Sequence, residues 1–155
     1  MNMTNLLNEK LICLDGTAAD STEAINLLGT MMVQDGYIHP SYIGAIHKRE
    51  INFPTGIVLA SCGIALPHAT PEDNVFKNGI AVLRLKQPVQ FHSMENPDDN
   101  VSVTLLFMLA LNGSENHLNM LQKLFAIFQQ ETLVQCMQQT TSAKEVCQLM
   151  LDNLK

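Results

Sequence analysis

The chain has 155 residues, of which 46% are hydrophobic and 15% are charged, and its formal net charge is −6. This composition excludes a disordered chain, and the length favours one domain, residues 1–155, with a core of its own. The acidic balance argues against a nucleic-acid partner, because nucleic-acid-binding proteins carry a basic patch.

The N-terminal third predicts a short lead-in and two helices. Residues 5–15 are rich in leucine and isoleucine and are compatible with a strand. Asp20 or Ser21 can cap a helix over 21–35, in which apolar residues recur at helical spacing. A second helix is predicted over 39–50, opened by the sequence His-Pro-Ser.

The middle of the chain predicts strands. The apolar run from Gly56 to Leu66 reads as buried strand sequence, in one strand or two. It stops at Pro67, because proline cannot donate a ladder hydrogen bond. Residues 79–86 predict another strand, 87–100 a long loop, and 101–111 a central strand, since the last run is the most continuously apolar.

Three helices are predicted after the strands, over 115–129, 131–138 and 143–153. Ser142 and Glu145 form a capping box for the last one. Helices before and after a block of strands predict an α/β fold: a single layered domain with a mixed β-sheet flanked by helices on both faces.

Other features point to a cytoplasmic protein. No apolar run reaches about 18 residues, and the N-terminus lacks the zones of a secretory signal. The four cysteines form no C-x-x-C motif, so reduced thiols are expected. His39, His47 and His92 lack metal-ligand spacing, and we expect neither a metal nor a cofactor.

His68 is the most informative candidate residue. It is the first polar side chain after the predicted strand end, so we expect it to be exposed on a loop. Thr70 and Asp73 fit the start of a helix, whose free amides would favour a phosphate beside His68. An imidazole with a pKa of about 6.5 is mostly unprotonated at neutral pH and can attack a phosphoryl donor. A nucleophilic imidazole beside an anion-binding backbone is the arrangement that phosphoryl transfer to histidine would need.

Taken alone, each candidate also has a simpler interpretation. His68 could be an ordinary loop histidine, and His117 a polar residue on the first turn of a helix. Arg49 could bind a phosphate through two hydrogen bonds, or be a solvated charge. A nucleophilic pair of Cys62 and His68 would suit a hydrolase, but six extended residues separate the two by about 20 Å, which favours a core thiol.

Two stretches of the chain resemble EIIA proteins of the fructose/mannitol class of the sugar phosphotransferase system. They are R-E-I-N-F-P-T-G-I at 49–57 and G-I-A-L-P-H at 63–68. His117, in N-H-L, lies at the usual place of a second active-site histidine, and the resemblance spans about residues 5–153. The form F-P-T-G-I is most like the galactitol branch. Many members have Gly-Asn-Gly just before the second stretch, where this chain has Ala-Ser-Cys-Gly.

The resemblance implies a layered α/β fold and a phosphocarrier function. His68 would take a phosphoryl group from the carrier HPr and pass it to a cysteine of an EIIB component. That component serves the membrane permease EIIC in sugar uptake, with galactitol as one candidate sugar. His117 would support the transfer, and Arg49 and Thr70 would support the phosphate.

An alternative is a regulatory EIIA protein of the nitrogen type, in which the phosphohistidine is a signal and no sugar follows. For either function we expect partners to dock on an apolar patch around His68, formed by Leu66, Pro67 and Ala69 and rimmed by acidic groups.

Overall fold

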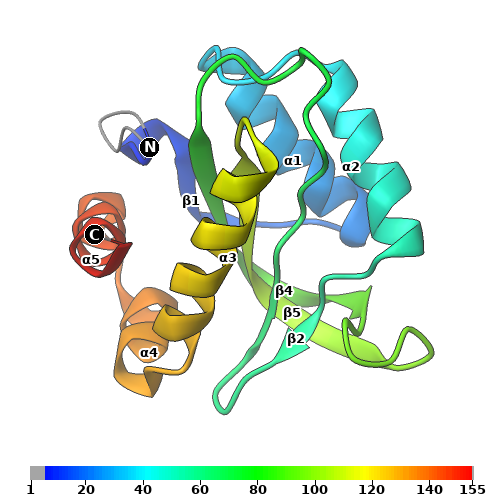
Figure 1. Cartoon of the computed structure of the whole chain (residues 1–155). Coiled ribbons are helices and arrows are strands. Elements are labelled where there is room, and N and C mark those ends of the chain that lie inside the picture. Colours follow the sequence, from blue (N-terminus) through cyan, green and yellow to red (C-terminus); the bar gives the residue numbers. More distant parts are fainter. Residues whose placement is uncertain (1–5, 155) are drawn as a thin grey trace.

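The computed structural model describes residues 6–154. Within these residues, five strands form one mixed sheet in the order β1-β4-β5-β3-β2 (Figure 1). The strands are β1 (Ile12–Gly16), β2 (Ile57–Val58), β3 (Gly63–Ala65), β4 (Gly79–His92) and β5 (Asn100–Ala110). β1 pairs with β4, and β3 with β5, in parallel, whereas β4 with β5 and β2 with β3 are antiparallel.

Helices cover both faces of the sheet, which confirms the predicted fold class (Figure 1). One face carries α1 (Ser21–Gln34) and α2 (Ser41–Asn52), and the other carries α3 (Ser114–Phe128), α4 (Glu131–Gln139) and α5 (Ala143–Leu154). A short 3-10 turn, η1 (Glu9–Leu11), precedes β1. Residues 80–83 of β4 alternate between the two cores, as the two-residue period of a strand requires.

The helix boundaries agree with the sequence within one or two residues. Asp20 caps α1 by accepting a hydrogen bond from the Glu23 amide at 2.9 Å. Ser142 accepts one from the Glu145 amide at 3.1 Å at the start of α5. None of the helices in the described part of the chain has both the length and the apolar character needed to cross a bilayer.

The predicted loop over 87–100 is wrong, because β4 continues to His92 and only residues 93–99 connect it to β5. Val89 and Phe91 are buried and pair with Val103 and Val101 of β5. Pro88 falls where the register shifts between β4 and β5, a place where a strand tolerates proline. The extended hairpin brings its tip beside Gly56, whose carbonyl accepts a hydrogen bond from the Met94 amide at 2.8 Å.

The apolar run from Gly56 to Leu66 forms two short strands, β2 and β3, joined by a turn. The Leu59 amide donates to the Cys62 carbonyl at 2.8 Å within that turn. A side chain at Gly63 would place its Cβ 2.1 Å from the carbonyl oxygen of Ser102 on β5. Glycine is therefore required at this close approach of β3 to β5.

The helix start predicted at Thr70 is also wrong, because residues 69–78 form no helix. Residue Asp73 is in the left-handed region, with φ of 57°, and the Asn74 carbonyl accepts from the His39 amide at 2.9 Å. Val75 makes an extended bridge with Ile38. Pairing with a distant segment outweighs the local capping pattern, and the anion site expected at a helix N-terminus is absent from this described segment.

Candidate active site

His68 lies directly beyond the end of β3, where the following chain is held against β5. The Leu109 amide donates to the Pro67 carbonyl at 3.0 Å. The prediction of an exposed His68 is wrong, because only 8% of the residue is accessible. Its ring nevertheless forms part of the wall of a surface pocket of about 230 Å³. Burial therefore leaves part of the imidazole open to a small group.

The hydrogen bonding of His68 fixes its tautomer. Nδ1 lies 2.6 Å from the carbonyl oxygen of Leu66. A carbonyl oxygen only accepts, so Nδ1 carries the proton in the neutral ring and donates it to Leu66. The lone pair is then on Nε2, which makes Nε2 the nucleophilic nitrogen.

His117, on the first turn of α3, lines the same pocket. The two imidazole rings are 5.8 Å apart between centroids, at an interplanar angle of 60°. Nε2 of His117 lies 2.7 Å from the Leu111 carbonyl oxygen and therefore donates to it. Nδ1 of His117 therefore carries the lone pair. In the neutral, unphosphorylated site the proton is on Nδ1 of His68 and on Nε2 of His117.

Arg49, near the end of α2, contributes the positive charge of the site. It lines the pocket with both histidines, and Thr70 lies in the same wall. Its Nε is buried and has no hydrogen-bond partner among the described residues. The guanidinium carbon lies 5.1 Å from the ring centre of Phe53. A buried donor without a partner is costly, so this guanidinium is prepared for an anionic ligand.

The same surroundings lower the pKa of both histidines from 6.5. For His68 the main cause is burial, and the charge of Arg49 and the His117 ring also lower the pKa, while the bond to Leu66 opposes them. For His117 the causes are burial and then Arg49, opposed by the bond to Leu111. A lowered pKa keeps His68 neutral, and thus nucleophilic, at a pH where a free imidazole is already protonated.

An NMR titration of the unphosphorylated protein tests this electrostatic description. The His68 ring should titrate below pH 6.5, and Arg49→Met should move its pKa upward, toward the value in the urea-unfolded chain. The native state then resists protonation more than the unfolded state, so stability should fall as the pH drops below about 6.5. A native His68 that titrates at or above pH 6.5 would contradict the description.

Tyr42 of α2 is a site residue that the sequence interpretation missed. Its hydroxyl accepts from the Ala69 amide at 3.1 Å and lies 2.7 Å from the Leu109 carbonyl and 3.0 Å from the Ala69 carbonyl. Burial raises the pKa of Tyr42 to about 12. The signal was its spacing of seven residues from Arg49, which places both on one face of α2.

Removing this hydroxyl should destabilise the fold. Tyr42→Phe leaves the buried Ala69 amide without an acceptor, which should lower the free energy of unfolding by about 1–3 kcal/mol. Urea unfolding followed by circular dichroism measures the change. Equal midpoints for the variant and the wild type would show that the hydroxyl does not hold the loop after His68.

Apolar side chains surround the pocket, but they are not the predicted ones. Leu66, Pro67 and Ala69 are buried and cannot form a docking patch. Three exposed apolar side chains line this pocket or the adjoining one, namely Leu118, Phe53 and Met94, at 59%, 63% and 41% accessibility. We call these three residues the apolar rim.

An adjoining pocket of about 350 Å³ connects His68 and Arg49 to two members of this rim and to the hairpin tip. Phe53, Met94 and Pro97 line it. Met94 and Pro97 of the hairpin tip therefore form part of the wall.

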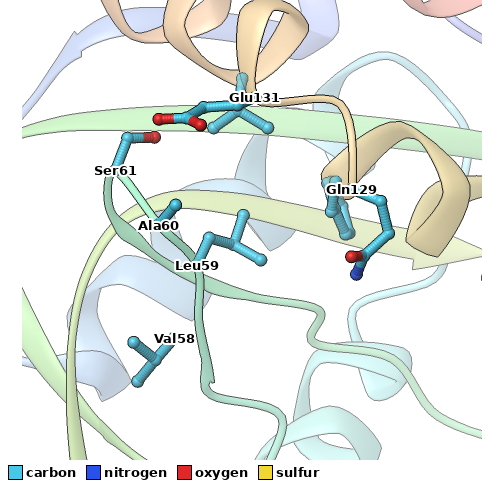
Figure 2. A pocket seen from close by; sticks show the side chains of 8 residues that line it. Val58, Leu59, Ala60, Ser61, Gln129 and Glu131 are labelled. Carbon is cyan, nitrogen blue, oxygen red and sulfur yellow. The ribbon is translucent and has the colours of Figure 1, made fainter.

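A separate pocket of about 210 Å³ shares no lining residue with the His68 pockets. Figure 2 shows its walls, which are the β2–β3 turn with Ser61 and the α3–α4 junction with Glu131. Cys62 in that turn is half-buried, and burial raises the pKa of its thiol. It lines neither His68 pocket, so a Cys62–His68 pair does not form. Within residues 6–154 no group of three or more histidine, cysteine, aspartate or glutamate side chains could hold a metal ion.

The sequence matches a known protein family over most of its length. The family described as phosphoenolpyruvate-dependent sugar phosphotransferase system, EIIA 2, matches residues 5–153. The chain belongs to this EIIA type 2 family. Its members are components of a phosphotransferase system.

Individual relatives are named for two sugars. The galactitol-specific EIIA component of Escherichia coli K12 is 31% identical, over 86% of this chain and 85% of that protein. The mannitol-specific EIICBA component of Pasteurella multocida is 29% identical over 94% of this chain, which spans about a fifth of that protein's length (22%). The solved complex of mannitol enzyme IIA with phosphorylated enzyme IIB of Escherichia coli matches with a TM-score of 0.79 and 28% identity, covering 94% of this chain and 97% of that one.

Proposed function

We propose that this EIIA protein is a cytoplasmic phosphocarrier, acting as a single domain over residues 1–155, in which His68 takes a phosphoryl group from phospho-HPr. His68 then passes the group to a cysteine of an EIIB component, which serves the membrane permease EIIC in sugar uptake. The observation that carries the proposal is the bond from Nδ1 of His68 to Leu66, because it leaves the Nε2 lone pair for the phosphoryl group.

In the first step the phosphoryl group moves from the donor histidine to Nε2 of His68. Its lone pair attacks phosphorus, the nitrogen–phosphorus bond of the donor histidine breaks, and that electron pair returns to the donor nitrogen. The His68 ring keeps its Nδ1 proton and becomes cationic, so its bond to the Leu66 carbonyl strengthens. In the second step the EIIB thiolate attacks phosphorus, and the electron pair of the breaking bond returns to Nε2.

The other pocket residues support the phosphate. Arg49 offers its guanidinium, whose Nε has no hydrogen-bond partner, and the Thr70 hydroxyl offers one more donor from the same wall. His117 would bind a phosphate oxygen through Nδ1 as an imidazolium, because the negative charge of the phosphate favours uptake of a proton from solvent on that nitrogen. Preorganised donors of this kind stabilise the charge that develops on a transferring phosphoryl group.

The acceptor that we place first is an EIIB component of galactitol type. The support is the F-P-T-G-I sequence and the galactitol-specific relative, and the mannitol-specific relatives make a mannitol EIIB the second choice. The test is to phosphorylate the chain with phosphoenolpyruvate, enzyme I and HPr, and then to add EIIB proteins of both types. Rapid transfer to one of them supports the uptake function. A stable phosphoprotein that transfers to none would favour the regulatory alternative.

Docking on the apolar rim gives a paired prediction. Phe53→Ser should raise the KM for phospho-HPr about tenfold, the effect of losing about 1.4 kcal/mol at a contact centre. Phe76→Ser is the matched control, because Phe76 is similarly accessible, at 59%, and lines none of the His68 pockets. Steady-state transfer measures both variants. Equal KM values for the two would place the docking surface elsewhere.

A further inference from the structure

Glu50 makes a two-pronged contact with Thr55 that the function described above does not use. One carboxylate oxygen, Oε2, accepts from the Thr55 amide at 2.7 Å, and the other, Oε1, accepts from the Thr55 hydroxyl at 2.8 Å. Thr55 is 3% exposed, so these bonds are shielded from water. Both oxygens act as acceptors, which is the arrangement that an ionised carboxylate requires.

The contact continues to the nucleophile. The Thr55 hydroxyl oxygen accepts from the Leu66 amide at 3.1 Å, and the Leu66 carbonyl accepts from Nδ1 of His68 at 2.6 Å. A hydroxyl has one proton. Because the Thr55 hydroxyl donates that proton in its hydrogen bond to Glu50, its oxygen is left as an acceptor for the Leu66 amide. The series therefore joins Glu50 to His68 through Thr55 and the two backbone groups of Leu66.

We propose that Glu50 and Thr55 are positioning residues, which hold Leu66 so that its carbonyl keeps the proton of His68 on Nδ1 and the lone pair on Nε2. This role rests on the proposed phosphorylation of His68. Glu50 follows Arg49 directly on α2, so the end of one helix supplies both the proposed phosphate ligand and the group that orients the nucleophile.

The physical reason is the narrow tolerance of group transfer. A shift of about 1 Å in a reacting atom can reduce a rate about 100-fold. Without the anchor at Thr55, the Leu66 amide loses its hydrogen bond, and the carbonyl of the same residue can move away from Nδ1 of His68. The imidazole then exchanges between tautomers, and only one of them has the lone pair on Nε2.

The test combines histidine ¹⁵N spectra of the unphosphorylated protein with single-turnover transfer from phospho-HPr. In the wild type, His68 should show protonated Nδ1 and unprotonated Nε2. Glu50→Gln and Thr55→Val should give mixed tautomers and transfer rates about 10–100-fold lower. Thr55→Ser, which keeps the hydroxyl, should retain the wild-type behaviour. Glu23→Gln, which removes an exposed carboxylate on α1, is the matched control for charge.

Two results would overturn the proposal. One is a wild-type His68 with its proton on Nε2, a result that needs no variant and no phosphoryl donor. The other is folded Glu50→Gln or Thr55→Val protein with wild-type tautomer and rate. If one of these variants fails to fold, the other decides, with Thr55→Ser as reference. A His68 that has the expected tautomer but takes no phosphoryl group would instead refute the proposed function.

Discussion

Replacing His68 by asparagine should abolish phosphorylation of the chain by phospho-HPr. The asparagine amide can still donate to the Leu66 carbonyl, so the buried loop keeps its hydrogen bond, but Nε2 and its lone pair are gone. Alanine is a poorer choice, because His68 is buried and its removal would also leave a cavity. Incubation with radiolabelled phosphoenolpyruvate, enzyme I and HPr measures acid-labile label.

The matched control for this experiment is His47→Asn. His47 is bonded through Nε2 to Asn26 at 2.7 Å, outside the pocket, and its loss should leave labelling normal. Circular dichroism and urea unfolding would test whether both variants are folded. Label on folded His68→Asn at the wild-type level would mean that another residue is the phosphoryl acceptor.

Replacing His117 by alanine should slow transfer to His68 without moving the label. Removing one positioned donor from a site of developing charge typically costs about 10²–10³ in rate. The reduction should appear in the single-turnover rate, measured by rapid quench, while His68 remains the labelled residue. His39→Ala, at an exposed histidine, is the control. A wild-type rate for His117→Ala would reduce His117 to a structural role at the start of α3.

Features of the fold that arise from local patterns were predictable. The helices α1 and α5 follow from apolar spacing and from the caps at Asp20 and Ser142. The continuous apolar run of β5 predicted a central strand, and β5 indeed lies between β4 and β3. Each of these signals depends on neighbours within about one helical turn or one strand.

The errors arose where a distant segment decides the structure. Gln87 and Pro88 resemble a break, but pairing with β5 carries β4 through them to His92. Thr70 resembles a helix cap, yet residues 74–75 pair with 38–39 in extended form. In both places tertiary hydrogen bonds outweigh a weak local preference.

The candidate site also combines features that the sequence predicted with features that only the folded chain reveals. The four candidates from the sequence, His68, His117, Arg49 and Thr70, line one pocket, because β3, α3 and α2 meet there. The burial of His68 and its bond to Leu66 depend on how the chain packs around β3, which residue types alone do not reveal. For the same reason the contact of Tyr42 with the loop after His68 became visible only in the folded chain.

The most direct test of the account is to identify the phosphorylated atom. The chain, labelled with ¹⁵N in its histidines and phosphorylated through HPr, is examined by ³¹P–¹⁵N correlation. We expect one phosphorus coupled to Nε2 of His68, with Nδ1 of the same ring still protonated. Phosphorus coupled to Nδ1 of His68, or to any other histidine, would contradict the account.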